Sequence, residues 1–179
     1  MRSSYKNNDL NYGDIISSAI FNKNPKNIVE FGILDGFSLK IFANTFPKAK
    51  IQAFDIFEEF NGNSSNSSIY NTFQEFPNVN IQYGDFYKKY NEFSNKSIDI
   101  LHIDIANTAD TYKFAIENYL PKLKHDGILI LEGGSHQRDQ VEWMLKYNKN
   151  PIQNYLSHLK KKLNLNIITI GEHPSITLI

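Results

Sequence analysis

Five short apolar runs alternate with helical patterns along the chain, and this alternation restricts the folds open to it. The runs that read as strands are residues 28–31, 51–55, 79–83, 98–104 and 128–131, and two further runs follow at 165–170 and 176–179. Alternating strands and helices form a parallel sheet covered on both faces, whereas the short link between the last two runs suits an antiparallel hairpin. The sequence therefore predicts an α/β fold: a doubly wound, mostly parallel, seven-stranded Rossmann-like sheet with a C-terminal antiparallel hairpin.

The helical patterns complete this arrangement within one domain that spans residues 1–179. The predicted helices cover about 14–21, 37–46, 69–76, 109–123, 138–147 and 151–162. Pro121 is expected to kink or end the fourth of these helices, and residues 125–127 read as a turn. We expect an N-terminal arm and helix in residues 1–24, with residues 1–12 as a loose arm, and a mobile polar loop at 61–68. Residues 135–163 would form a helix pair that covers a substrate or makes a dimer contact.

The composition argues against several functional classes. The 19 basic and 19 acidic side chains give zero net charge, so no basic surface for nucleic acid or an anionic membrane is predicted. The absence of cysteine rules out disulfides and thiolate metal sites. The chain shows neither an apolar signal-peptide core nor a run of about 20 apolar residues. We expect a soluble, cytoplasmic protein.

A glycine turn follows the first predicted strand. The strand ends in Gly32, Gly36 comes four residues later, and a helical pattern begins near Ser38. Glycine lets the backbone approach a ligand closely, and the free N–H groups of a helix start favour electron-rich ligand atoms. The turn is typical of a nucleotide-like ligand site, although any α/β protein has strand–turn–helix connections.

Acidic residues end the next four predicted strands. They are Asp55, Asp85, Asp104 and Glu132. Parallel sheets bind ligands beyond the carboxyl ends of their strands. One such acid alone would read as a helix cap or a solvated loop residue, but four together indicate a site for a ligand with hydroxyl and cationic groups, since like charges repel polyphosphates. The glycine spacing also lacks the Gly-x-Gly-x-x-Gly fingerprint, which disfavours an NAD-linked oxidoreductase.

These motifs resemble a known family. The stretch from Val29 to Ser38 looks like the first motif of class I S-adenosylmethionine-dependent methyltransferases, and the resemblance extends over about residues 13–179. Asp55 stands where that family has its ribose-binding acid, and Gly84-Asp85-Phe86 resembles the third-strand motif near the adenine. The cofactor-binding residues that the resemblance implies are Glu30, Gly32, Asp35, Gly36, Ser38, Asp55, Ile56, Gly84, Asp85 and Asp104.

A narrower resemblance concerns the second half of the chain. His102-Ile103-Asp104, Tyr112-Lys113 and the stretch from Leu120 to Glu132 are similar to macrocin-type O-methyltransferases, which act on sugar hydroxyls with a divalent metal. The resemblance implies Asp104 and Glu132 as ligands of Mg²⁺. Glu132 replaces an Asp of that family, and Gly133 stands where a second acid or amide would be, so the metal set departs from the family pattern.

Residues after the fifth strand supply candidates for the acceptor side. We predict His136 as the general base, with Asp104 as a second catalytic residue, because a hydroxyl acceptor must lose a proton and the usual pKa of histidine is about 6.5. The alternative for His136 is a helix cap or a solvent-facing side chain. His102 lies inside a strand and reads as a core residue or a support for the site.

Two more side chains are predicted to contact the substrate. Arg138 would bind an anionic acceptor group, with an ion pair to Asp139 or Glu142 as the alternative. Trp143 would wall the pocket together with Phe57 and Phe60, or else belong to the core.

The sequence thus predicts an S-adenosylmethionine-dependent methyltransferase that acts on a small molecule. The expected reaction is O-methylation of a sugar or glycan precursor, and a homodimer is possible because the chain has no room for a separate substrate domain. The alternative is a nucleotide-binding or assembly module that kept the fold and lost catalysis.

Overall fold

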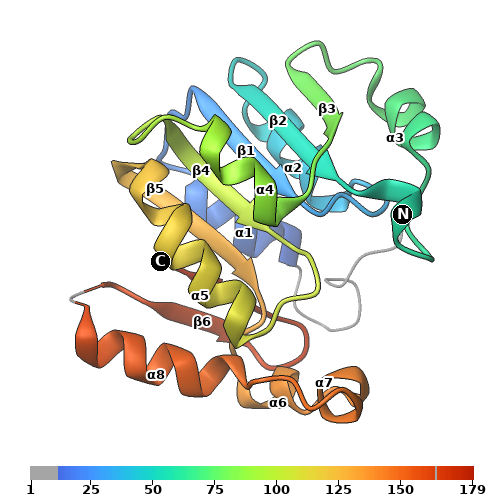
Figure 1. The fold of residues 1–179 in the computed structure, drawn as a ribbon. Helices are drawn as coiled ribbons and strands as arrows, with labels where there is room; N and C mark the ends of the chain where they lie inside the picture. Colours follow the sequence, from blue (N-terminus) through green and yellow to red (C-terminus); the bar gives the residue numbers. More distant parts are fainter. Residues whose placement is uncertain (1–11, 164) are drawn as a thin grey trace.

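One seven-stranded sheet forms the centre of the molecule in a computed structural model that describes residues 12–163 and 165–179 (Figure 1). Its strands are β1 (Asn27–Phe31), β2 (Lys50–Asp55), β3 (Val79–Tyr83), β4 (Ile98–Ile103), β5 (Leu123–Glu132), β6 (Ile168–Gly171) and β7 (Ser175–Leu178). The spatial order is β3-β2-β1-β4-β5-β7-β6, with the first five strands parallel and β7 antiparallel to both neighbours. The predicted fold class, including the antiparallel hairpin, is confirmed.

Helices cover both faces of this sheet. They are α1 (Tyr12–Ile20), α2 (Phe37–Thr45), α3 (Asn66–Phe73), α4 (Phe86–Lys89), α5 (Ala109–Asn118), α6 (His136–Asp139), α7 (Glu142–Lys146) and α8 (Ile152–Lys162), with 3₁₀ turns η1 (Phe57–Glu59), η2 (Tyr90–Glu92) and η3 (Leu120–Lys122). Helices α1, α2 and α3 enclose one hydrophobic core, whereas α4, α5 and α8 enclose the other. No helix in the described part of the chain is long and apolar enough to cross a membrane.

An aromatic cluster joins β1 to the helices on the second face. The ring of Phe31 stacks on that of Phe54 with centroids 5.2 Å apart and meets the rings of Phe86 and Tyr119 edge-on at 5.4 and 5.3 Å. Phe31 is 1% exposed. Phe31 is the last residue of β1 and directly precedes Gly32. This packing therefore fixes the position of the end of β1 relative to the helices on the second face.

Several predicted boundaries were wrong for identifiable reasons. Tyr12, predicted to lie in the loose arm, already belongs to helix α1: its side chain is buried, and its hydroxyl donates a hydrogen bond to the Pro174 carbonyl. The rest of the predicted arm lies outside the described residues. The polar stretch 61–68 is not all loop, since Ser65 caps α3 by accepting the Ser68 N–H at 3.2 Å. Such short polar side chains satisfy the free N–H groups of a helix start.

Two further differences affect the acceptor side. The turn at 125–127 lies within β5, where the pairing with β4 jumps from Leu123 to Ile128 and the residues between them form an irregularity. The helix predicted at 138–147 is two short helices, α6 and α7, and the strand predicted at 165–170 begins at Ile168. Helix α5 ends at Asn118, before Pro121, as the position of that proline requires.

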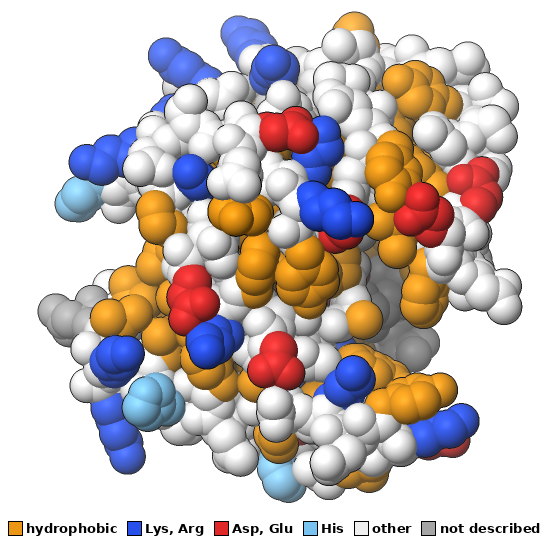
Figure 2. All heavy atoms as spheres, in the orientation of Figure 1, with side chains coloured by type: hydrophobic (Ala, Val, Ile, Leu, Met, Phe, Trp, Pro, Cys, Tyr) orange, Lys and Arg blue, Asp and Glu red, His pale blue; other side chains and the backbone are white. Residues whose placement is uncertain are grey.

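Surface charge is mixed on the face drawn in Figure 2. Acidic side chains lie among the Lys and Arg side chains there, and hydrophobic side chains gather toward the middle of the face. This distribution agrees with the zero net charge of the chain.

Replacing Phe31 with Ala should destabilise the protein strongly. Loss of a buried aromatic ring costs about 3–5 kcal/mol through lost burial and the cavity that remains. Phe21→Ala is the matched control, because Phe21 is 77% exposed and its loss should change stability by about 0.5 kcal/mol or less. Urea unfolding of the two variants measures the difference, and equal midpoints would contradict this account of the cluster.

Candidate functional site

The turn after β1 brings two strand ends into direct backbone contact. Gly32 has φ +89°, and a Cβ added there would overlap the carbonyl oxygen of Asp104. The N–H of Asp104 in turn donates to the Phe31 carbonyl at 2.9 Å. Gly36 has φ +81° and lies against the ring of Phe73, which leaves no room for a side chain. Both glycines are therefore required by geometry, and Asp104 is placed beside the turn.

Asp55 is buried at the end of β2, and its carboxylate is fully hydrogen-bonded. One oxygen accepts the N–H groups of Ile33 at 2.6 Å and Leu34 at 3.3 Å. The other accepts the N–H of Phe57 at 2.7 Å and the side-chain amide of Asn63 at 2.9 Å. The predicted ribose-binding acid thus holds the glycine turn and the following loop together.

Asp35 and Asp85, two further acids near this edge, are half-buried. The Ser64 hydroxyl donates to Asp35 at 2.6 Å. Asp85 caps α4 by accepting the Tyr87 N–H at 2.9 Å and forms an ion pair with Lys88 at 3.1 Å. Two predicted cofactor neighbours lie nearby in the chain: Ile56 is half-buried before η1, and buried Gly84 packs against the Phe54 ring. Phe57 is buried and Phe60 is exposed.

Glu30, Ser38 and His102 form a polar group inside the core. The Ser38 hydroxyl donates to Glu30 Oε1, and His102 Nδ1 lies 2.9 Å from the same oxygen. Glu30 and His102 have no exposed surface, and Glu30 Oε2 has no hydrogen-bond partner among the described residues. His102 is a core residue, and this group ties β1, β4 and the first turn of α2 together beneath the glycine turn.

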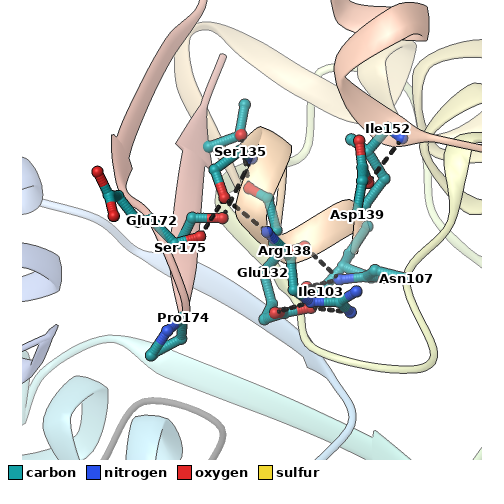
Figure 3. Close-up of polar contacts among 12 residues, drawn as sticks. Ile103, Asn107, Glu132, Ser135, Arg138, Asp139, Ile152, Glu172, Pro174 and Ser175 are labelled. Atoms are coloured by element: carbon teal, nitrogen blue, oxygen red, sulfur yellow. Dashed lines mark hydrogen bonds and ion pairs between the residues drawn. The ribbon is translucent and has the colours of Figure 1, made fainter. Parts of the chain in front are cut away.

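An ion pair dominates the other half of the site (Figure 3). Arg138 donates through Nε to Glu132 Oε1 at 2.6 Å and through Nη2 to Oε2 at 2.7 Å, and both side chains are buried. Burial alone would lower the pKa of Arg138, but the hydrogen bond and the charge of Glu132 outweigh it and raise that pKa. The alternative interpretation of Arg138, an ion pair with Asp139 or Glu142, was wrong about the partner, which is Glu132.

Asp139 has a different task. Its carboxylate accepts the N–H groups of Ile152 and Gln153, each at 2.9 Å, and so caps the N-terminus of α8 (Figure 3). Ser135 caps α6 by accepting the Arg138 N–H at 3.0 Å. These two caps hold Arg138 in place from both sides.

The predicted magnesium site is not supported. Both oxygens of Glu132 are bonded to Arg138, whose positive charge neutralises that carboxylate. Within residues 12–163 and 165–179, no group of three or more His, Cys, Asp or Glu side chains lies together to hold a metal ion. Asp104 and Glu132 therefore do not form the oxygen-rich set that Mg²⁺ needs.

The other acceptor-side candidates lie around this ion pair. His136 begins α6 and is exposed. Trp143, on α7, is half-buried, with the Arg138 guanidinium 5.3 Å from its ring centroid.

Asn107 was missed as a site residue by sequence reasoning. It is fully buried, and its amide donates to the carbonyls of Ile103 at 3.0 Å and Glu132 at 2.9 Å. Asn107 Oδ1 and Arg138 Nη1 are buried without a hydrogen-bond partner among the described residues. The only sequence signal for Asn107 was its position three residues after Asp104, the acid that follows β4.

Comparison with known proteins identifies the family. Residues 29–132 match the family described as "Methyltransferase domain", which covers more than half of the chain and every strand end from Gly32 to Glu132. The chain belongs to this family of class I S-adenosylmethionine-dependent methyltransferases. No curated protein matches it significantly.

Solved structures share the fold at low identity. A Staphylococcus aureus protein provisionally named a caffeoyl-CoA O-methyltransferase has 22% identity and a TM-score of 0.74 over 97% of this chain and 84% of its own. PaMTH1 from Podospora anserina, bound to S-adenosylhomocysteine, has 14% identity and a TM-score of 0.70 over 93% and 76%. TomG, an O-methyltransferase from Streptomyces achromogenes in complex with S-adenosylmethionine, has 13% identity and a TM-score of 0.65 over 93% and 78%.

Replacing Arg138 with Met should destabilise the fold, because the Glu132 carboxylate would remain buried without its partner. Breaking one side of a buried ion pair costs about 3–5 kcal/mol, whereas removing both charges costs less. The double variant Glu132→Gln/Arg138→Met should therefore be more stable than Arg138→Met alone in urea unfolding. Lys113→Met, which removes an exposed charge 4.0 Å from Glu117, is the control and should cost about 0.5 kcal/mol or less. A double variant no more stable than the single one would refute the buried-pair account.

Proposed function

We propose that the protein transfers a methyl group from S-adenosylmethionine to a hydroxyl of a small molecule, and that a sugar or glycan precursor is the acceptor. The observation that carries this proposal is the contact between Gly32 and Asp104, with Asp55 at the neighbouring strand end. This contact supports the proposal because it brings the glycine turn next to an acidic residue in a chain of the methyltransferase family.

The residues at this edge fit the cofactor. Asp55 would accept hydrogen bonds from the ribose hydroxyls. Asp35 and Asp85 add negative charge nearby, which suits a cationic ligand. Glu30 has no exposed surface, so it would not contact the cofactor itself. It would instead hold the Ser38 side chain in place beneath the cofactor. The left-handed backbone of Gly32 supports close approach by a ligand. When bound, S-adenosylmethionine supplies an electrophilic methyl group on its sulfonium.

The ion pair of Glu132 and Arg138 favours an uncharged acceptor. Since the two charges cancel, Arg138 offers little net attraction to a carboxylate or phosphate. A neutral hydroxyl group both donates and accepts, which suits the unpartnered Asn107 Oδ1 and Arg138 Nη1. The flat ring of Trp143 beside them would pack against the apolar face of a sugar, and α6–α8, within residues 135–163, would cover the acceptor.

Asp104 and His136 remain the candidates for accepting the proton of the hydroxyl. Asp104 is half-buried beside the glycine turn, and its charge contributes to the raised pKa of Arg138. His136 is exposed at the start of α6. We therefore favour Asp104 as the base, with His136 contributing only where the acceptor reaches α6.

Binding of S-adenosylhomocysteine tests the cofactor assignment. Calorimetry should show binding by the intact protein, and Asp55→Ala should weaken it about tenfold to a hundredfold, because hydrogen bonds to a charged group contribute about 1.5–3 kcal/mol. Asp126→Ala, which removes an exposed acid of the β5 irregularity, should bind as the wild type does. If the intact protein does not bind S-adenosylhomocysteine at high micromolar concentration, the cofactor assignment is wrong.

Turnover tests the base. With labelled S-adenosylmethionine and a panel of sugars and small acids, Asp104→Asn should lower kcat about a hundredfold or more while S-adenosylhomocysteine still binds. His136→Ala should change kcat by about threefold or less. The reverse result would assign the base to His136, and binding without turnover on any acceptor would favour the binding-module alternative.

A further inference from the structure

The carboxylate of Asp55 has no hydrogen-bonding direction left for a ligand. A carboxylate offers about four acceptor directions, two on each oxygen. Ile33, Leu34, Phe57 and Asn63 fill two directions on each oxygen, at distances from 2.6 to 3.3 Å. A ribose hydroxyl that binds Asp55 must therefore displace one of these donors.

Three of the four donors are backbone groups that are difficult to move. Ile33 and Phe57 are each 3% exposed and belong to a hydrophobic core. Leu34 and Phe57 have left-handed backbones, with φ 50° and 47°, which side chains rarely adopt. Such strained conformations persist only where the surroundings hold them in place.

Asn63 is the one side chain among the four donors, and it is the easiest to release. It is half-buried, so its amide can return to water after a change of rotamer. Gly62 precedes it with φ +105°, and no atom lies within 4 Å of where a Cβ would stand. Gly62 thus provides the left-handed backbone that bends the chain just before Asn63.

The same loop is attached to a second acid of the cofactor edge. Ser64, the next residue, donates to Asp35 at 2.6 Å, and the N–H of Asn63 donates to the Phe60 carbonyl at 3.1 Å. The segment 57–66 therefore contacts both Asp35 and Asp55, the acids to which the proposed function assigns the cofactor.

We propose that the Asn63 amide occupies the position on Asp55 that a ribose hydroxyl takes, so that cofactor binding displaces Asn63 and Asn63 sets the cofactor affinity. This inference rests on the proposed function, because it requires the cofactor ribose at Asp55. It makes the polar loop a part of the cofactor site: in the free protein the loop satisfies a buried carboxylate, and in the complex the ligand replaces it.

Removing the amide should tighten cofactor binding. Asn63→Ala leaves Asp55 with one free direction, so S-adenosylhomocysteine no longer competes with a protein donor, and its Kd in calorimetry should fall about tenfold. Asn61→Ala is the matched control: Asn61 is an exposed asparagine of the same loop, and its replacement should leave the Kd within about twofold.

Hydrogen exchange tests the contact without any ligand. In the free protein, backbone amides of residues 57–66 should exchange faster in Asn63→Ala than in the wild type or in Asn61→Ala, because the loop has lost its bond to Asp55. Unchanged exchange would show that Asn63 does not hold the loop and would overturn the inference.

The outcomes separate this inference from the proposed function. If the wild type binds S-adenosylhomocysteine and Asn63→Ala binds it equally or more weakly, the inference is overturned while the proposed function stands. If neither protein binds, both are overturned. Tighter binding together with faster loop exchange supports both.

Discussion

The close approach of Gly32 to Asp104 is the constraint on which the site depends. Strands β1 and β4 are neighbours in the sheet, and at their ends the Phe31 carbonyl and the Asp104 N–H still pair at 2.9 Å while the chain turns away into α2. Only a residue without a Cβ fits against the Asp104 carbonyl there. This contact fixes where the β1 turn lies relative to the acid after β4, and the Phe31 ring cluster holds it from below.

Backbone N–H groups donate most of the hydrogen bonds to Asp55, the acid that the proposed function assigns to the cofactor. The Asp55 carboxylate accepts hydrogen bonds from three backbone N–H groups and one side-chain amide. On the acceptor side the buried acid Glu132 is instead neutralised by Arg138. One sheet edge therefore combines an electronegative half, suited to a cationic ligand, with a half that carries little net charge.

The sequence predicted the parts of the fold that local patterns determine. The order of strands, the glycine turn and the acids at strand ends follow from periodicity and from residue type, and the structure places Gly32, Asp55, Asp104 and Glu132 at strand ends as expected. The pairing of Glu132 with Arg138 was not predictable, because it depends on how far α6 turns back over β5. The bond from Asn63 to Asp55 was missed for a similar reason: a polar, low-complexity loop carries no periodicity to show what it touches. The separate helices α6 and α7 depend on a turn that no glycine or proline marks.

The position of β7 has a consequence for the order in which the molecule assembles. Strand β7 lies between β5 and β6 and holds Gly133, the first residue after β5. The Ser175 carbonyl accepts the Gly133 N–H at 2.7 Å, and the Thr177 hydroxyl donates to the Gly133 carbonyl at 2.8 Å. Gly32, Asp55 and Asp104 come much earlier in the chain. During synthesis, which runs from the N-terminus, strands β1 to β4 can pair before β7 exists. The segment from Gly133 to α6, which carries Arg138, must wait about 40 residues for its support. Nascent chains should thus acquire the two halves of this site one after the other.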